Sequence, residues 1–204
     1  MTTWVLGFDL SLTAPAAIAL PLDWRPGDWK RAKAWLAEPP APEGQDDLAG
    51  QLVRYIAIAE WAVRCAVSCG RHVRGYIESY GFNKNNANAS RLQESGGHVK
   101  AMLYRECGLI LRPVTSSEAR KLTLGFNPRA PNYDAKFEVQ NTVFNKFKAP
   151  KKWDENQCDG FLVAQFGLAA EGGKILSLPP PKKAQRVRCG SVRKRKVDTR
   201  TSLP

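Results

Sequence analysis

The sequence predicts an α/β domain in which helices flank both faces of one mixed central sheet. Three short apolar runs within the first 37 residues have the character of strands, and the later strand-like runs alternate with helix-like ones. A chain of 204 residues, 43% of them hydrophobic, is long enough to bury one core of this kind. This order of elements predicts one sheet covered by helices on both sides.

The first half of the chain supplies the early strands and one long helix. The strands are predicted at residues 3–10, 14–20 and within 30–37, ahead of a Pro-rich stretch at 38–44. A helix over 48–69 follows, with Asp46 or Asp47 as its N-cap and Gly70 as its stop. Its apolar stripe at helical spacing consists of Leu48, Leu52, Ile56, Ala59, Val63 and Val67.

The second half alternates strands with helices. The predicted order is a strand over 73–79, a helix over 90–106, a strand over 109–114, a short helix from Ser116 through Leu122, and helices over 135–148 and 154–170. The short helix begins after Thr115, and Glu118 stands at the spacing of a capping box. The sheet therefore gains two more strands, each followed by helical segments.

Positive charge is concentrated at the C-terminus. The segment 182–204 has nine Lys or Arg against one Asp, so it carries a net +8 of the chain's +12. We therefore predict a domain over residues 1–178 and a disordered, Pro-flanked basic tail over 179–204. Such a tail binds nucleic acid without sequence preference, although a solubility tail or a targeting signal is an alternative.

The chain has the sequence features of a cytoplasmic protein. Asp9 interrupts the first apolar run, which no basic region precedes, and no apolar stretch approaches the roughly 20 residues that a membrane span requires. The five cysteines show no zinc spacing, so we expect reduced thiols. We predict a cytoplasmic or nucleoid-associated location, or the host cytoplasm for a phage protein, with an organelle as the alternative.

Three acidic residues stand at the ends of apolar elements. Asp9 and Glu78 end strand-like runs, and Asp159 opens a helix-like run. Such carboxylates can meet at one edge of a sheet and hold two Mg²⁺ ions, with Mn²⁺ as a substitute. On a basic chain the fitting substrate is a phosphodiester, so the sequence predicts a metal-dependent nuclease.

The motifs around these acids resemble those of the RuvC-type Holliday junction resolvases, which have the RNase H-like fold. Gly7-Phe8-Asp9-Leu10-Ser11 is similar to the first-strand motif, Tyr76-Ile77-Glu78 to the fourth-strand motif, and the segment 154–164 to the closing acidic motif. The resemblance covers most of residues 3–170. It implies metal ligation by Asp9, Glu78 and Asp159, and symmetric nicks in four-way DNA that leave 5′-phosphate and 3′-hydroxyl ends.

The fourth acid departs from the family pattern. The usual partner three residues before the last aspartate is Asp or His, and here that position is Asn156. Some relatives place the acid four residues earlier, which is Glu155, and both positions share the helix face of Asp159. We favour Glu155, with Asp154 and Asn156 as alternatives.

The resemblance also assigns roles to basic and aromatic residues. Lys121 and Lys136 match lysines near the scissile phosphate, and Tyr80 and Phe82 match a loop that meets the junction centre. The remaining candidates for DNA contact are basic residues: Lys84, Arg91, Lys100, Arg105, Lys151, Lys152, Arg193, Lys194, Arg195 and Lys196. A homodimer that pairs through the helix at 90–106 follows from the resemblance, with an apolar face of Leu92, Val99, Met102 and Leu103.

The predicted function is therefore resolution of four-way (Holliday) junctions by a homodimer that needs divalent metal and no small-molecule cofactor. Three alternatives stay open. They are another RNase H-like nuclease acting on branched DNA or RNA/DNA, a non-catalytic junction-binding module in which Asn156 marks a decayed site, and an actin-like or sugar-kinase ATPase. The last lacks its second phosphate loop and its Gly-rich adenosine motif here.

Overall fold

The sheet has five strands in the order β3-β2-β1-β4-β5. The computed structural model describes residues 1–44, 47–79, 87–125 and 134–174. Its strands are β1 (Trp4–Asp9), β2 (Ala16–Pro21), β3 (Lys33–Leu36), β4 (Val73–Ser79) and β5 (Leu111–Thr115). β1 runs antiparallel to β2 and parallel to β4, which confirms the predicted mixed sheet.

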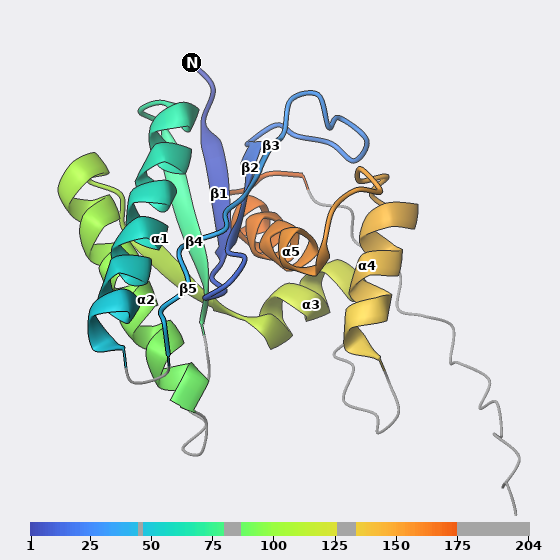
Figure 1. The fold of residues 1–204 in the computed structure, drawn as a ribbon. Coiled ribbons are helices and arrows are strands. Elements are labelled where there is room, and N and C mark those ends of the chain that lie inside the picture. Colours follow the sequence, from blue (N-terminus) through green and yellow to red (C-terminus); the bar gives the residue numbers. More distant parts are fainter. Residues whose placement is uncertain (45–46, 80–86, 126–133, 175–204) are drawn as a thin grey trace, which may run out of the picture.

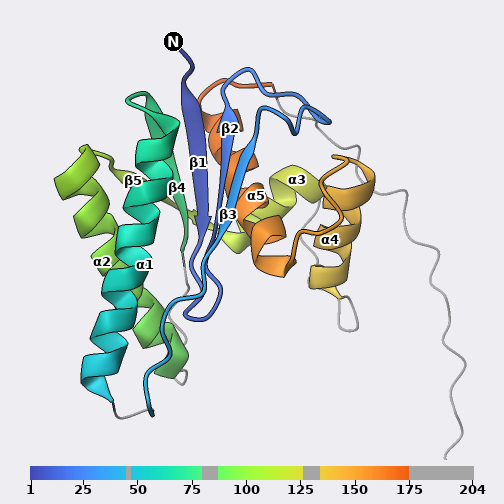
Figure 2. The same cartoon turned by 45° about the horizontal axis from the view of Figure 1, so that its top comes forward.

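Helices cover both faces of this sheet, as Figures 1 and 2 show. The helices are α1 (Leu48–Cys69), α2 (Ala87–Cys107), α3 (Ser116–Leu124), α4 (Ala135–Asn145) and α5 (Glu155–Ala170). α1 and α2 lie on one face, and α3, α4 and α5 lie on the other. Alternation along β1 divides its side chains between two cores, with Val5 packing on the α5 side and Leu6 and Phe8 on the α1 side.

Close packing of α5 on β1 depends on small residues. A Cβ on Gly7 would lie 2.3 Å from the Ala164 nitrogen and 2.7 Å from the Gly160 carbonyl oxygen. Gly160, Ala164 and Gly167 recur every three or four residues, so they share one face of α5. This face approaches the sheet, and the start of α5 therefore lies against the carboxyl end of β1.

An aromatic cluster fixes the N-terminal half of α5. The ring of Phe161 lies 5.8 Å from that of Trp24, 5.3 Å from that of Trp29 and 6.1 Å from that of Trp153. Trp29 Nε1 also donates a hydrogen bond to the Phe147 carbonyl oxygen at 2.9 Å. Because Phe161 follows Asp159 by two residues, this cluster holds the position of the Asp159 backbone.

The predicted order of elements is confirmed, but the apolar stripe predicted for α1 is mostly wrong. Leu48, Leu52 and Val67 are 76%, 47% and 64% exposed. The inward face instead carries aromatic, branched and small residues, which are Tyr55, Ile58, Ala59, Ala62, Cys65, Ala66 and Cys69. Small residues let α1 approach both the sheet and α2, whereas the larger leucines point outward.

The helix predicted to form the dimer contact packs inside the protomer. Val99 and Leu103 of α2 are fully buried against the core that α1 shares with the sheet. Val99 and Leu103 are therefore not available to a second copy, whereas Leu92 and Met102 are half-buried. α2 also begins three residues earlier than predicted, at Ala87, and α4 ends three residues earlier, at Asn145.

Some predictions fall outside the residues that the structure describes. They concern the basic tail with Arg193, Lys194, Arg195 and Lys196, and the loop residues Tyr80, Phe82 and Lys84. None of the described helices combines the length and the apolar character that crossing a membrane requires.

Candidate active site

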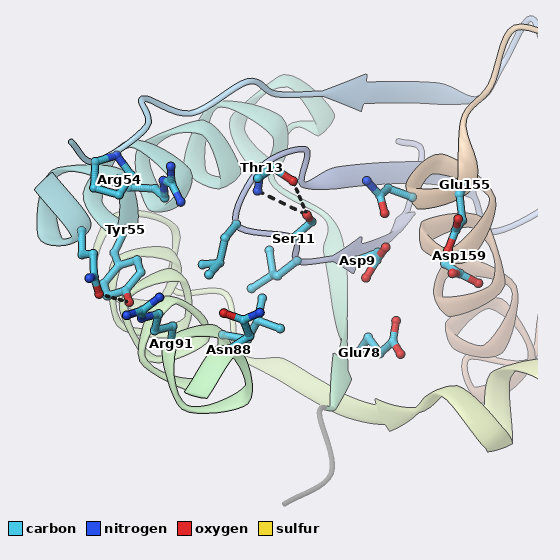
Figure 3. A pocket seen from close by; sticks show the side chains of 16 residues that line it. Asp9, Ser11, Thr13, Arg54, Tyr55, Glu78, Asn88, Arg91, Glu155 and Asp159 are labelled. Carbon is cyan, nitrogen blue, oxygen red and sulfur yellow. Dashed lines mark hydrogen bonds between the residues drawn. The ribbon is translucent and has the colours of Figure 1, made fainter. Parts of the chain in front are cut away.

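A cavity of about 470 Å³ lies at the carboxyl ends of β1 and β4, and the predicted acids line it. Phe8 stands opposite Ile77 in the parallel ladder, so Asp9 and Glu78 follow at adjacent positions. Asp9 shares the strand face of Val5 and Gly7, and Glu78 shares that of Tyr76, which also packs on the α5 side. Asp159 and Glu155 enter the cavity from the first turns of α5 (Figure 3).

The pKa of Asp159 depends on its burial and on the charges of the residues around it. Burial raises the pKa of its carboxyl from 3.8 to about 6. Arg120 opposes this rise, whereas the negative charges of Glu78 and Glu155 add to it. The carboxylates are therefore close enough to repel one another, which is the electrostatic condition of a cation site.

Side chains from α3 and α4 offset part of this negative charge. Ser116 Oγ donates a hydrogen bond to Glu78 Oε1. Arg120 Nη2 lies 3.6 Å from Asp159 Oδ1, and Lys136 Nζ lies 2.5 Å from Glu155 Oε1. The hydrogen bond to Glu155 raises the pKa of Lys136. Glu78, Asp159 and Glu155 thus each have a neutral or positive partner from α3 or α4.

The three candidates for the fourth acid have different surroundings. Asp154 is the N-cap of α5, where its Oδ1 accepts from the Gln157 backbone nitrogen at 2.8 Å. Asn156 Nδ2 donates to the Ala14 carbonyl oxygen at 2.8 Å, which ties α5 to the turn before β2. Glu155 and Asn156 both line the cavity, and Glu155 pairs with the exposed Lys136 side chain rather than with the backbone. Of the three side chains, those of Asp154 and Asn156 bond to backbone, whereas that of Glu155 pairs with another side chain.

The chemistry of the cavity fits divalent cations. Four carboxylates offer the hard oxygen ligands that Mg²⁺ and Mn²⁺ prefer. In the described part of the chain, however, no group of three or more Asp, Glu, His or Cys side chains is arranged closely enough to hold a metal ion. Ser116, Arg120 and Lys136 contact Glu78, Asp159 and Glu155, so cation binding requires these carboxylates to leave their partners and turn inward.

Of the two predicted lysines, the structure brings one to the acids. Lys136 contacts Glu155, whereas Lys121 is exposed and does not line the cavity. The neighbouring Arg120 points to Asp159 instead, and its buried Nε has no hydrogen-bond partner among the described residues. Sequence reasoning missed Arg120, although the capping box at Thr115 sets where α3 begins and hence which residue of the pair faces inward.

The predicted DNA contacts divide in the same way. Arg91 lines the cavity, whereas Lys100, Arg105, Lys151 and Lys152 are exposed elsewhere. The cavity also has lining residues on α1 that the sequence reasoning did not single out, Gln51, Arg54 and Tyr55. Arg54 and Tyr55 lie at the end of the cavity away from the acids (Figure 3).

The fold is similar to that of a known junction enzyme. The structure of Thermus thermophilus RuvC superposes with a TM-score of 0.58 and 16% identity, over 84% of this chain and 98% of RuvC. T. thermophilus RuvC in complex with a Holliday junction substrate gives a TM-score of 0.56 and 14% identity, over 84% and 96% of the two chains. No protein-family model and no curated protein sequence matches this chain. The chain thus has a RuvC-like fold, an α/β architecture of the RNase H-like kind, as the sequence motifs predict.

Proposed function

We propose that this protein is a metal-dependent endonuclease that cuts four-way DNA junctions. The observation that carries the proposal is the cavity in which carboxylates from β1, β4 and α5 gather at one sheet edge. The RuvC-like fold supports it, because one of the similar structures is a complex with a Holliday junction substrate. The positive net charge of +12 suits a polyanionic substrate.

Asp9, Glu78, Glu155 and Asp159 are the proposed ligands of two Mg²⁺ or Mn²⁺ ions. Bound ions would activate a water molecule and neutralise the charge that develops on the leaving oxygen. Burial raises the pKa of Asp159, and a bound cation would oppose this rise, because a nearby positive charge favours the ionised carboxylate. Binding would also remove the repulsion among these acids.

Lys136 and Arg120 supply positive charge beside the carboxylates Glu155 and Asp159. We propose that they release the carboxylates to the ions and turn to the phosphate, where a cation stabilises the transition state. Lys121 is exposed on α3, so it is a weaker candidate than Lys136 for a role near the scissile phosphate. Tyr80, Phe82, Lys84 and the basic tail keep their predicted roles in DNA binding as proposals.

We also propose a homodimer, because two symmetric nicks in a two-fold junction need two sites. The outer face of α1 supports this better than α2 does. Leu48, Leu52, Val53 and Ile56 there are 76%, 47%, 56% and 39% exposed, which is unusual for four neighbouring apolar side chains. The cytoplasmic location stays a prediction from the sequence.

Cleavage of labelled DNA tests the proposal. The substrates are a four-way junction, the matched linear duplex and an RNA/DNA hybrid, each with Mg²⁺, Mn²⁺ or EDTA. We expect paired nicks in the junction alone, abolished by EDTA and lowered at least ~100-fold in Asp9→Asn. Asp23→Asn is the matched control, because Asp23 is 71% exposed and far from the cavity lining.

The other outcomes separate the alternatives. Cleavage of the hybrid or of linear duplex at a similar rate would indicate another nuclease of this fold. Junction binding without cleavage in either metal would indicate a binding module, with Asn156 as the first residue to restore to an acid.

A further inference from the structure

The cavity continues past the acids to a second end of different chemistry. Gln51, Arg54 and Tyr55 of α1 and Asn88 and Arg91 of α2 line that end. Figure 3 shows Arg54, Tyr55, Asn88 and Arg91 together on one side and the carboxylates on the other, with Ser11 and Thr13 between them. One cavity thus joins an acidic end to a basic and amide-rich end.

The basic end is built on buried and fixed groups. Gln51 and Tyr55 are 8% and 4% exposed, and the Tyr55 hydroxyl donates to Gln51 Oε1 at 3.4 Å. Arg54 Nε donates to the Pro40 carbonyl oxygen at 2.8 Å. This bond orients a guanidinium group that has four further N–H donors. Arg54 therefore has a set position rather than that of a free surface arginine.

The charges of Arg54 and Arg91 both affect the Tyr55 hydroxyl. Burial raises the pKa of the Tyr55 hydroxyl, and the positive charges of Arg91 and Arg54 work against that rise, while Glu94 adds to it. The two guanidinium groups therefore lie near this hydroxyl, and Glu94 is not among the residues that line the cavity. Two guanidinium groups and the amides of Gln51 and Asn88 in one cavity match the oxygens of a phosphate.

We propose that Arg54 and Arg91 bind a DNA phosphate next to the scissile one on the same strand. The inference rests on the proposed nuclease function and extends it to the path of the strand. The scissile phosphate would lie over the acids, and the strand would cross Ser11 and Thr13 to the basic end. Anchoring a neighbouring phosphate fixes the register of the reacting group, which bare attraction to a basic surface does not.

Neutralising single phosphates tests this path. A fluorescent four-way junction carries one uncharged methylphosphonate, placed in turn at each phosphate around the crossover. Binding is measured by anisotropy in Ca²⁺. We expect wild type to lose about tenfold in affinity at one position beside the cleaved bond. The double variant Arg54→Gln/Arg91→Gln should bind the unmodified junction about tenfold more weakly than wild type does. Its affinity should not fall further when the methylphosphonate is at that position.

Arg64→Gln is the control, because Arg64 is exposed on α1 and does not line the cavity. Arg64→Gln should keep the full loss of affinity that the methylphosphonate causes. In the double variant the slope of log affinity against log salt concentration should be lower, by about one unit per lost phosphate contact. An equal methylphosphonate loss in the double variant, or the same relief in Arg64→Gln, would overturn the proposal.

The failure of the nuclease function would look different. Wild type would then bind the junction and show the expected coupling between phosphate and arginine, yet cut nothing in Mg²⁺ or Mn²⁺. That result would support the phosphate site and contradict the catalytic one.

Discussion

Helix α5 has a carboxylate at each end, and the two have opposite surroundings. Asp159, in its first turns, lies in the cavity with Glu78 and Glu155 and has a pKa raised to about 6 by burial. Glu171, directly after its last turn, accepts hydrogen bonds from the Tyr76 hydroxyl and Arg112 Nη1, each at 2.7 Å. Arg74 Nε adds an ion pair with Glu171 at 3.5 Å.

The comparison distinguishes an acid that holds two elements together from an acid that we propose as a metal ligand. The donors around Glu171 come from β4 and β5, so that carboxylate holds the helix to the sheet. Around Asp159 lie the acids Glu78 and Glu155 as well as Arg120, and burial beside further acids costs stability in the metal-free protein. Proteins retain such costs where a ligand compensates for them.

The largest expected effect on stability comes from the contact that positions Asp159. Gly7→Ala places a Cβ 2.3 Å from backbone of α5, so we expect a loss of about 3 kcal/mol in the free energy of unfolding. Gly167→Ala, toward the Glu171 end, meets the Tyr76 ring at 2.4 Å. We expect about 1–2 kcal/mol there, since side chains can move aside. Urea denaturation measures both.

Gly97→Ala is the control for these substitutions. A Cβ there meets no atom within 4 Å, and the residue lies inside α2. Alanine should therefore stabilise the protein by about 0.5–1 kcal/mol. A loss at Gly97 as large as at Gly7 would show that close packing of α5 is not the cause.

The pKa of Asp159 predicts a stability effect that depends on pH. Because folding raises this pKa from 3.8 to about 6, the protonated form is favoured, and its contribution is complete below pH 3.8. The contribution is lost as pH rises through about 6, at a cost of up to roughly 3 kcal/mol. In EDTA, Asp159→Asn should raise the melting temperature at about pH 7.5 and change it little at about pH 4. A variant that is equally stabilised at both pH values would contradict the assigned burial.

The smallest effect concerns the other end of α5. Glu171→Gln should lower the free energy of unfolding by about 1 kcal/mol, because its arginine partners are 60% and 57% exposed and solvent weakens both pairs. Junction cleavage should not change. Glu106→Gln, which breaks the exposed pair with Arg105, should change stability by less than about 0.5 kcal/mol. A loss of cleavage in Glu171→Gln would end the distinction between the two acids.

Much of this architecture was predictable, because the order of strands and helices follows from the apolar runs and from the Gly, Pro and capping residues that separate them. The acids Asp9, Glu78 and Asp159 could be placed together because parallel strands end at the same edge of a sheet. The inward face of α1 could not be placed. The spacing of the leucines predicted that they form the buried face of α1. Packing against both the sheet and α2 instead buries smaller residues, chiefly alanines and cysteines.

The details of the site depended on local geometry that spacing does not fix. Residues three and four before Asp159 share its helix face, and the capping bond of Asp154 and the Ala14 contact of Asn156 separate them from Glu155. Arg120 and Lys121 are adjacent in α3, and the direction in which each side chain leaves the helix decides that Arg120 contacts Asp159 while Lys121 is exposed. Arg54 and Gln51 reach the cavity from a distant helix, and no local motif signals that contact.

Mn²⁺ binding by calorimetry tests most directly whether the acids at the start of α5 form a cation site. Wild type and Glu171→Gln should bind Mn²⁺ alike, and Asp159→Asn should bind it at least about tenfold more weakly. Equal binding by all three proteins, or weaker binding in Glu171→Gln alone, would contradict the account.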